Sequence, residues 1–108
     1  MSADDPRLEE VFSALADPTR RRVMTFLSER GPVSATDLAG ELPVTRQAVA
    51  KHLVALEAAG LVQSERSGRE RRYTLTPGPL AEAMGWMTDV GAQWDRRLGA
   101  LRRHLASE

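Results

Sequence analysis

The sequence predicts a mainly α-helical chain with one β-hairpin, an α+β fold with about five helices. Apolar residues recur every three or four positions over most of the chain, which is the spacing of helices packed on a core. One basic stretch, residues 61–76, departs from this spacing and is divided by a glycine, as in a hairpin. With 108 residues and 11.9 kDa, residues 1–108 are expected to form a single domain.

Two Asp-Pro pairs mark the starts of the first two helices, which are expected within residues 8–30. In Asp5–Pro6 and Asp17–Pro18 the aspartate is a suitable N-cap. Proline suits the first helical position because its missing N–H needs no partner there. Gly31–Pro32 then ends the second helix. We therefore expect two consecutive helices that stop before this glycine.

Two more helices, joined by a tight turn, are expected within residues 34–59. Ser34 and Asp37 have the spacing of a capping box, in which each side chain satisfies a backbone N–H at the start of a helix. Pro43 breaks this helix, Thr45 caps the next one, and a glycine after residue 59 ends it. The pattern indicates a helix-turn-helix unit.

A hairpin and a long helix complete the chain. The hairpin spans residues 61–76 with its tip at Ser67–Glu70, where Gly68 supplies the positive φ that a tight turn needs. Pro77–Pro79 is expected to close the hairpin, and a helix is expected over residues 80–106. A helix-turn-helix followed by a basic hairpin is the winged helix-turn-helix arrangement, in which the hairpin is the wing.

The distribution of charge favours nucleic acid as a partner of this unit. The formal net charge is zero, but residues 45–72 hold six basic side chains against three acidic ones. A local excess of basic residues provides a surface for DNA phosphates. We therefore expect double-stranded DNA to be the partner.

The helix of residues 46–59 is the predicted reading helix. Val49, Leu53 and Leu56 share one narrow arc of it, so the opposite arc faces outward. A helix in the major groove contacts bases mainly through its N-terminal residues, and the long side chains of Arg and Gln suit guanine and adenine. The predicted DNA-binding residues are Ser34, Thr36, Thr45, Arg46, Gln47, Ala50, Lys51, His52, Arg66, Arg69, Arg71 and Arg72.

Some of these residues have a structural alternative. The polar arc of the reading helix is otherwise an ordinary solvated face. His52 lies at the edge of this arc, where it is as well placed to brace the helix as to contact a phosphate. Arg66 and Arg72 can pair with neighbouring glutamates on a hairpin kept soluble by charge, whereas Arg69 at the tip is the better candidate for DNA.

The last helix carries a heptad seam with alternating steps of four and three residues: Leu80, Met84, Met87, Gly91, Trp94, Leu98, Leu101 and Leu105. One helix cannot bury so long a seam within a chain of this size, so we expect it to pack, with the first helix, against a second copy. The predicted interface of this homodimer is Leu8, Val11, Phe12, Leu80, Met84, Met87, Trp94, Leu98 and Leu101. Alternatively, Trp86 and Trp94 line a pocket for a small-molecule inducer.

Three segments, Phe12–Arg22, Thr45–Leu53 and Ala59–Val62, closely resemble the corresponding parts of ArsR-type winged-helix repressors. The resemblance covers residues 8–73 by motif and the rest by helix placement. It implies a homodimeric transcriptional regulator whose reading helices recognise a palindromic operator, with repression relieved by an inducer. Many members of the family carry serine where Ala50 stands.

No metal or other cofactor is expected. Metal-sensing members of the family carry a cysteine pair in the segment that reads Val33–Leu38 here, and this chain has no cysteine. A second family site uses carboxylates and histidines on the last helix. For that site Asp89, His104 and Glu108 are a poor match, because their spacing is wrong.

Other classes of protein find less support. We find no nucleophile and base pair, no glycine-rich phosphate loop and no metal motif, so an enzyme is not expected. No apolar run reaches the length of a membrane span and the N-terminus lacks a secretion signal, so the cytoplasm is the expected location. The remaining rival is a winged-helix module that serves protein association without sequence-specific DNA binding.

Overall fold

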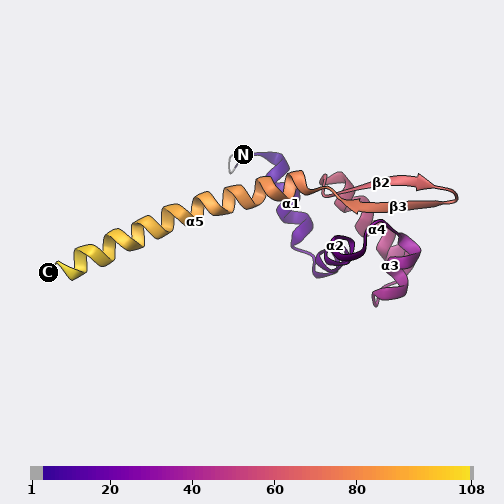
Figure 1. Ribbon diagram of the computed structural model, residues 1–108, viewed down its shortest axis with the longest axis horizontal. Helices are drawn as coiled ribbons and strands as arrows, with labels where there is room; N and C mark the ends of the chain where they lie inside the picture. The colour runs from indigo at the N-terminus through magenta and orange to yellow at the C-terminus, as the bar shows by residue number, and fades with distance from the viewer. Residues whose placement is uncertain (1–3, 108) are drawn as a thin grey trace.

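Two capped helices open the structure, a computed structural model that describes residues 4–107 (Figure 1). α1 (Pro6–Leu15) and α2 (Pro18–Arg30) both begin at a proline, which confirms the two Asp-Pro starts. The carboxylates of Asp5 and Asp17 each accept a backbone N–H two residues ahead, at 2.9 and 2.8 Å. Each cap satisfies a donor that the first turn leaves without a helical partner.

α3 (Ala35–Glu41) and α4 (Arg46–Ala58) form the predicted helix-turn-helix. Both halves of the capping box are present, because Ser34 Oγ accepts the N–H of Asp37 at 3.1 Å and the Asp37 carboxylate accepts the N–H of Ser34 at 3.2 Å. Thr45 Oγ1 caps α4 by accepting a backbone N–H at 3.1 Å. These caps determine which residues stand in the first turn of each helix.

β2 (Val62–Ser67) and β3 (Glu70–Leu75) pair in antiparallel fashion to form the wing. At its tip Gly68 has φ +64°, a conformation that strains residues with a Cβ. A third strand, β1 (Val33–Ser34), pairs with β3 and gives the sheet order β1-β3-β2. β1 was not predicted, because a strand of two residues shows no alternation of apolar and polar side chains. This strand joins the base of the wing to the start of α3.

The core lies between the first four helices, the base of the wing and the first turns of α5. The predicted inner arc of α4, formed by Val49, Leu53 and Leu56, is at most 1% exposed. Leu8 and Val11 are 2% and 0% exposed, on an α1 that packs against α2 and α5. Side chains buried to this extent in the single chain have almost no surface left to bury against a second copy. These two predicted dimer contacts are therefore corrected to core residues.

α5 (Pro77–Ala106) begins three residues before its predicted start. Pro77 and Pro79 lie in its first turn, where a helix needs no proline N–H, so the expectation that Pro77–Pro79 lies outside the helix is wrong. α5 packs on α1 near its start and then extends away from the body (Figure 1). The molecule measures 70 Å along this direction and 26 and 19 Å across it. Within residues 4–107 no helix is both long and apolar enough to span a membrane.

The two tryptophans of α5 lie in different surroundings. Trp86 packs edge-on against Phe12 with 5.7 Å between the ring centroids, and both side chains are half-buried. Trp94 follows roughly 12 Å further along the helix and is 57% exposed. In the single chain Trp86 and Trp94 therefore have different surroundings, and the small-molecule site between them stays a prediction.

Candidate nucleic-acid interface

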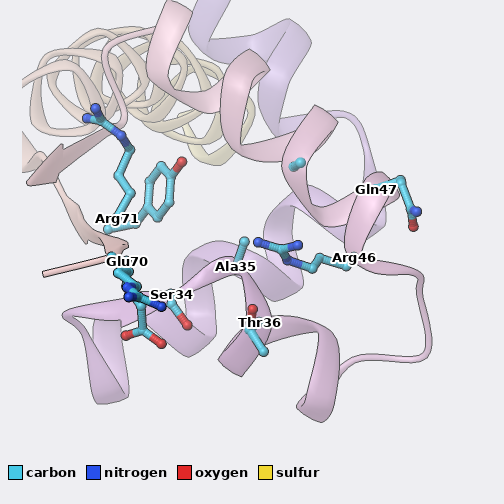
Figure 2. Close-up of a pocket in the computed structure, with 10 residues that line it drawn as sticks. Ser34, Ala35, Thr36, Arg46, Gln47, Glu70 and Arg71 are labelled. Atoms are coloured by element: carbon cyan, nitrogen blue, oxygen red, sulfur yellow. The ribbon is translucent and has the colours of Figure 1, made fainter. Parts of the chain in front are cut away.

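The starts of α3 and α4 and the wing enclose an open cleft of about 450 Å³ (Figure 2). The lining contains three arginines and one glutamate, which makes the cleft electropositive. Three segments far apart in the chain meet here because β1 holds the wing against the start of α3. The predicted DNA-binding residues that line the cleft are Ser34, Thr36, Arg46, Gln47, Ala50, Arg69 and Arg71.

The outer face of α4 is exposed from its first turn onward. Arg46 extends toward α3, whereas Gln47 points away from it on the other side of the helix start (Figure 2). Ala50 and Lys51 follow one turn later, and both are exposed. Val54 continues the same face at 67% exposure and offers an apolar surface of the kind that contacts a thymine methyl. Val54 was not among the predicted contacts, although its helical spacing from Gln47 places it on this arc.

The two capping hydroxyls in the predicted set serve the helices themselves. Ser34 is 4% exposed, and its Oγ accepts a backbone N–H of α3. Thr45 is exposed, and its Oγ1 accepts a backbone N–H of α4. Thr36 stands exposed in the first turn of α3. Ser34 and Thr45 thus hold the helix starts in place, and Thr36 is an exposed residue of the cleft lining.

His52 braces α4 against α2. Its Nδ1 accepts a hydrogen bond from Arg20 Nε at 3.4 Å, and the side chain is half-buried. Arg20 also donates its backbone N–H to the cap residue Asp17 at 3.1 Å. This hydrogen bond is the main cause of a pKa for Asp17 below its usual range, and the nearby charge of Arg20 acts in the same direction. This contact joins Arg20 and His52, which are 32 residues apart, so no local sequence motif predicts it.

Two of the four wing arginines are engaged within the chain. Arg71 Nη1 donates to Ser64 Oγ at 3.0 Å, and Ser64 Oγ donates to Glu57 Oε1 on α4 at 3.2 Å. Arg72 Nη2 lies 3.8 Å from a carboxylate oxygen of Glu70, in a pair about half exposed on both sides. Such an exposed pair contributes little to stability, but it offsets the charge of Arg72 locally.

The other two wing arginines remain directed to solvent. Arg66 and Arg69 are exposed, and neither makes a side-chain hydrogen bond or ion pair within residues 4–107. Arg69 follows Gly68 at the tip, and Arg66 lies on β2 near the tip. Their guanidinium groups are therefore the most available of the wing for phosphates.

The residues considered for metal do not form a site. Asp89 and His104 are 15 residues apart on α5, roughly 22 Å along the helix. Glu108 lies outside the described residues. Among residues 4–107 no cluster of three histidine or acidic side chains is placed to hold a metal ion, and the chain contains no cysteine.

An exposed polar face on the second helix of a helix-turn-helix, set beside a basic hairpin, defines a winged helix-turn-helix DNA-binding protein. A family model described as a helix-turn-helix domain matches residues 15–65.

Relatives cover nearly the whole chain. The HTH-type transcriptional regulator Rv2034 of Mycobacterium tuberculosis is 38% identical over 100 residues, which are 93% of this chain and 90% of that protein. The transcriptional repressor SdpR of Bacillus subtilis is 30% identical over 91 residues, 84% of this chain and 100% of SdpR. A solved structure, the ArsR-like transcriptional regulator from Rhodococcus sp. RHA1, is 45% identical with a TM-score of 0.83 and covers 94% of this chain and 93% of its own.

This chain belongs to the ArsR-type family of winged helix-turn-helix transcriptional regulators. It is accordingly a DNA-binding transcriptional regulator and not an enzyme.

Proposed function

We propose that this protein represses transcription by binding a palindromic operator as a homodimer. The observation that carries the proposal is the outer face of α4, where Arg46 and Gln47 stand exposed in the first turn beside the basic wing. The N-terminal residues of a helix in the major groove are the ones that reach base edges. Repression rather than activation is supported by the relative SdpR, which is named a repressor.

We assign the contacts by side-chain chemistry. Arg46 and Gln47 take base edges, since Arg pairs with guanine and Gln with adenine. Lys51 and Thr36 lie on the rim of the same surface and take phosphates. Arg69 at the wing tip reaches the neighbouring DNA backbone.

The second copy covers the apolar side of α5. An isolated helix in water is marginally stable, and an uncovered apolar stripe adds a cost that a partner removes. Half-buried Phe12 and Leu80 continue this surface toward the body. The large apolar side chains of the stripe are 44–61% exposed: Met84, Met87, Trp94, Leu98, Leu101 and Leu105.

Charge and shape favour an antiparallel pair of α5 helices. In a parallel pair, Arg97 beside the seam of one copy would face Arg102 of the other, at two symmetric places. An antiparallel pair centred between Ala92 and Gln93 brings no like charges together. It also places Trp94 opposite the partner subunit's Gly91. Apart from Gly91's own neighbours and the adjoining helix backbone, no described atom lies within 4 Å of a Cβ built at Gly91, so the glycine leaves space for the indole ring.

The experiment that tests the proposal is selection of bound duplexes from a random DNA pool, followed by titration of the selected duplex at several salt concentrations. We expect a palindrome with half-sites about one helical turn apart. The double variant Gln47→Ala/Lys51→Ala should lose it, while the matched control Gln93→Ala/Arg96→Ala, on the outer side of α5, should bind like wild type. If wild type enriches no sequence, or the reading-face variant binds unchanged, the winged helix serves protein association instead.

We place the protein in the cytoplasm and treat residues 1–108 as one functional domain. The relatives described above belong to bacteria, whose DNA lies in that compartment. The reading face and the dimer seam both belong to this chain, and α5 packs on α1 of the same body.

A further inference from the structure

We infer that Arg71 is a positioning residue for the wing, acting through Ser64 and Glu57, and that phosphate contacts fall to Arg66 and Arg69. The inference rests on the proposed function, because it assigns roles within the same DNA-binding surface. It departs from the sequence-based expectation that all the wing arginines contact DNA.

The geometry turns Arg71 back toward the body of the protein. Its Nη1 donates to Ser64 Oγ at 3.0 Å, a diagonal neighbour on the same face of the wing. The Ser64 hydroxyl donates in turn to Glu57 Oε1 at 3.2 Å, near the end of α4. One hydroxyl thereby accepts from the wing and donates to the reading helix, so the chain of bonds links the two parts that must grip DNA together.

Repulsion between Arg66 and Arg71 explains why one of these two arginines is turned toward Glu57. Arg66 and Arg71 are direct partners across β2 and β3 and lie on the same face of the wing. Two like charges placed opposite each other repel, so a hairpin with both guanidiniums directed outward would be destabilised. The carboxylate of Glu57, reached through Ser64, draws one of the two charges toward α4. Arg66 keeps its place near the tip and remains available for a phosphate.

The link also lies where the wing needs support. The β1 pairing reaches β3 at Tyr73 and Arg72, near the base of the wing. Beyond Arg72 the wing has no strand partner other than its own second strand. Ser64 pairs with Tyr73 at this same level, where its bond to Glu57 fixes β2 to α4, and the bond from Arg71 connects β3 near the tip to that fixed point.

The test measures the DNA affinity of variants for which two explanations predict opposite results. Loss of a negative charge should strengthen DNA binding, whereas loss of the Arg71–Ser64–Glu57 hydrogen bonds should weaken it. Glu57→Ala removes a negative charge close to the wing, so electrostatics alone predicts tighter DNA binding. We expect instead a loss of about three- to tenfold, the effect of removing one or two hydrogen bonds. Ser64→Ala, which changes no charge, should lose the same amount. The matched control Glu65→Ala removes an acid that faces Arg72, outside the link, and should bind as tightly as wild type or tighter.

Salt dependence separates positioning from contact. Each lost phosphate contact lowers the slope of log affinity against log salt by about 0.9, hence by about 1.8 in a dimer. We expect this decrease for Arg69→Gln, and a slope close to wild type for Arg71→Gln. The double variant Glu57→Ala/Arg71→Gln should bind no more weakly than Arg71→Gln alone, because both changes break one link.

Three results in the DNA-binding measurements would overturn the inference: unchanged or tighter binding by Glu57→Ala, a slope decrease in Arg71→Gln equal to that in Arg69→Gln, or additive losses in the double variant. A lower unfolding midpoint in Ser64→Ala with unchanged affinity would also overturn it, because the link would then serve folding alone. Failure of the proposed function is distinguishable, since wild type itself would then select no operator.

Discussion

At the residue scale, a few capping side chains decide what the DNA-binding surface presents. Thr45 Oγ1 accepts a backbone N–H at 3.1 Å and makes Arg46 the first residue of α4. Arg46 and Gln47 therefore stand in the turn that enters a groove first. Asp17 plays the same part for α2, and the helix that it starts carries Arg20, the brace of His52.

The cap at Asp17 makes part of the protein's stability depend on pH. The pKa of Asp17 lies below its ordinary value of 3.8, chiefly because the Arg20 N–H bonds the charged carboxylate. A lowered pKa in the folded state gives stability that is present above about pH 4 and is lost as pH falls through the folded pKa. Between about pH 6 and pH 3, wild type should lose more free energy of unfolding than Asp17→Asn, because asparagine caps without titrating.

Urea unfolding of both proteins at the two pH values checks this expectation. The comparison isolates Asp17, since Asp5, whose pKa is also lowered, is common to both proteins. Equal losses in wild type and Asp17→Asn would contradict it.

At the scale of elements, two glycines connect the reading helix to the wing and shape the wing tip. Gly60 follows α4 with φ +75°, and Gly68 turns the hairpin with φ +64°. Both conformations disfavour a Cβ. The two sites differ in their neighbours. A Cβ at Gly60 would lie 3.3 Å from Pro79 Cγ, whereas a Cβ at Gly68 would have no neighbouring atom within 4 Å among the described residues.

Alanine at these two positions should therefore destabilise the protein by different amounts. Gly68→Ala should cost about 1–2 kcal/mol, the penalty of a left-handed conformation. Gly60→Ala should cost more, since the new methyl group also presses on Pro79 at the start of α5. Free energies of unfolding from urea titrations check the order. An equal cost at both sites would show that α5 moves aside without resistance.

At the scale of the whole molecule, the projecting part of α5 has an apolar side that the single chain does not cover. The body buries its own core, while the distal part of α5 extends into solvent with its apolar side uncovered (Figure 1). The proposed homodimer would cover this side and would also set two reading helices about 34 Å apart, one turn of DNA.

A charge placed in the seam should dissociate the dimer. Leu98 is 44% exposed in the single chain and lies in the middle of the distal seam. Leu98→Asp would bury an unpaired carboxylate at the interface, so we expect a monomer that no longer binds the operator. Sedimentation equilibrium and operator titration measure both effects. Gln93→Asp, on the outer side of the same helix, should remain dimeric, and a dimeric Leu98→Asp would contradict the interface.

The absence of native cysteine allows a direct test of the antiparallel arrangement. In the proposed register Leu98 faces the partner subunit's Met87. The double variant Met87→Cys/Leu98→Cys should therefore form disulfide-linked dimers on mild oxidation, while each single variant should stay unlinked. Denaturing gel electrophoresis without reductant shows the outcome. Cross-linking by Leu98→Cys alone would indicate a parallel pair.

The sequence by itself determined the features that depend on near neighbours in the chain. Helix starts at Asp5, Asp17, Ser34 and Thr45 were predictable because a cap acts within about three residues. The outward position of Gln47 and Lys51 followed from the helical period alone. These local rules were sufficient to predict the winged helix-turn-helix and the face of α4 that we propose reads DNA.

Only the tertiary structure decided the features that depend on pairs far apart in the chain. Val33 pairs with Tyr73 across 40 residues, so no local pattern could announce β1. The spacing of Leu8 and Val11 showed that one side of α1 is apolar, but packing decided that this chain covers it. The direction of Arg71 likewise depends on Glu57, which lies on another element. The sequence pattern indicates that an apolar face needs covering or that a charge needs a partner. Only the packed chain shows which group covers the face or pairs with the charge.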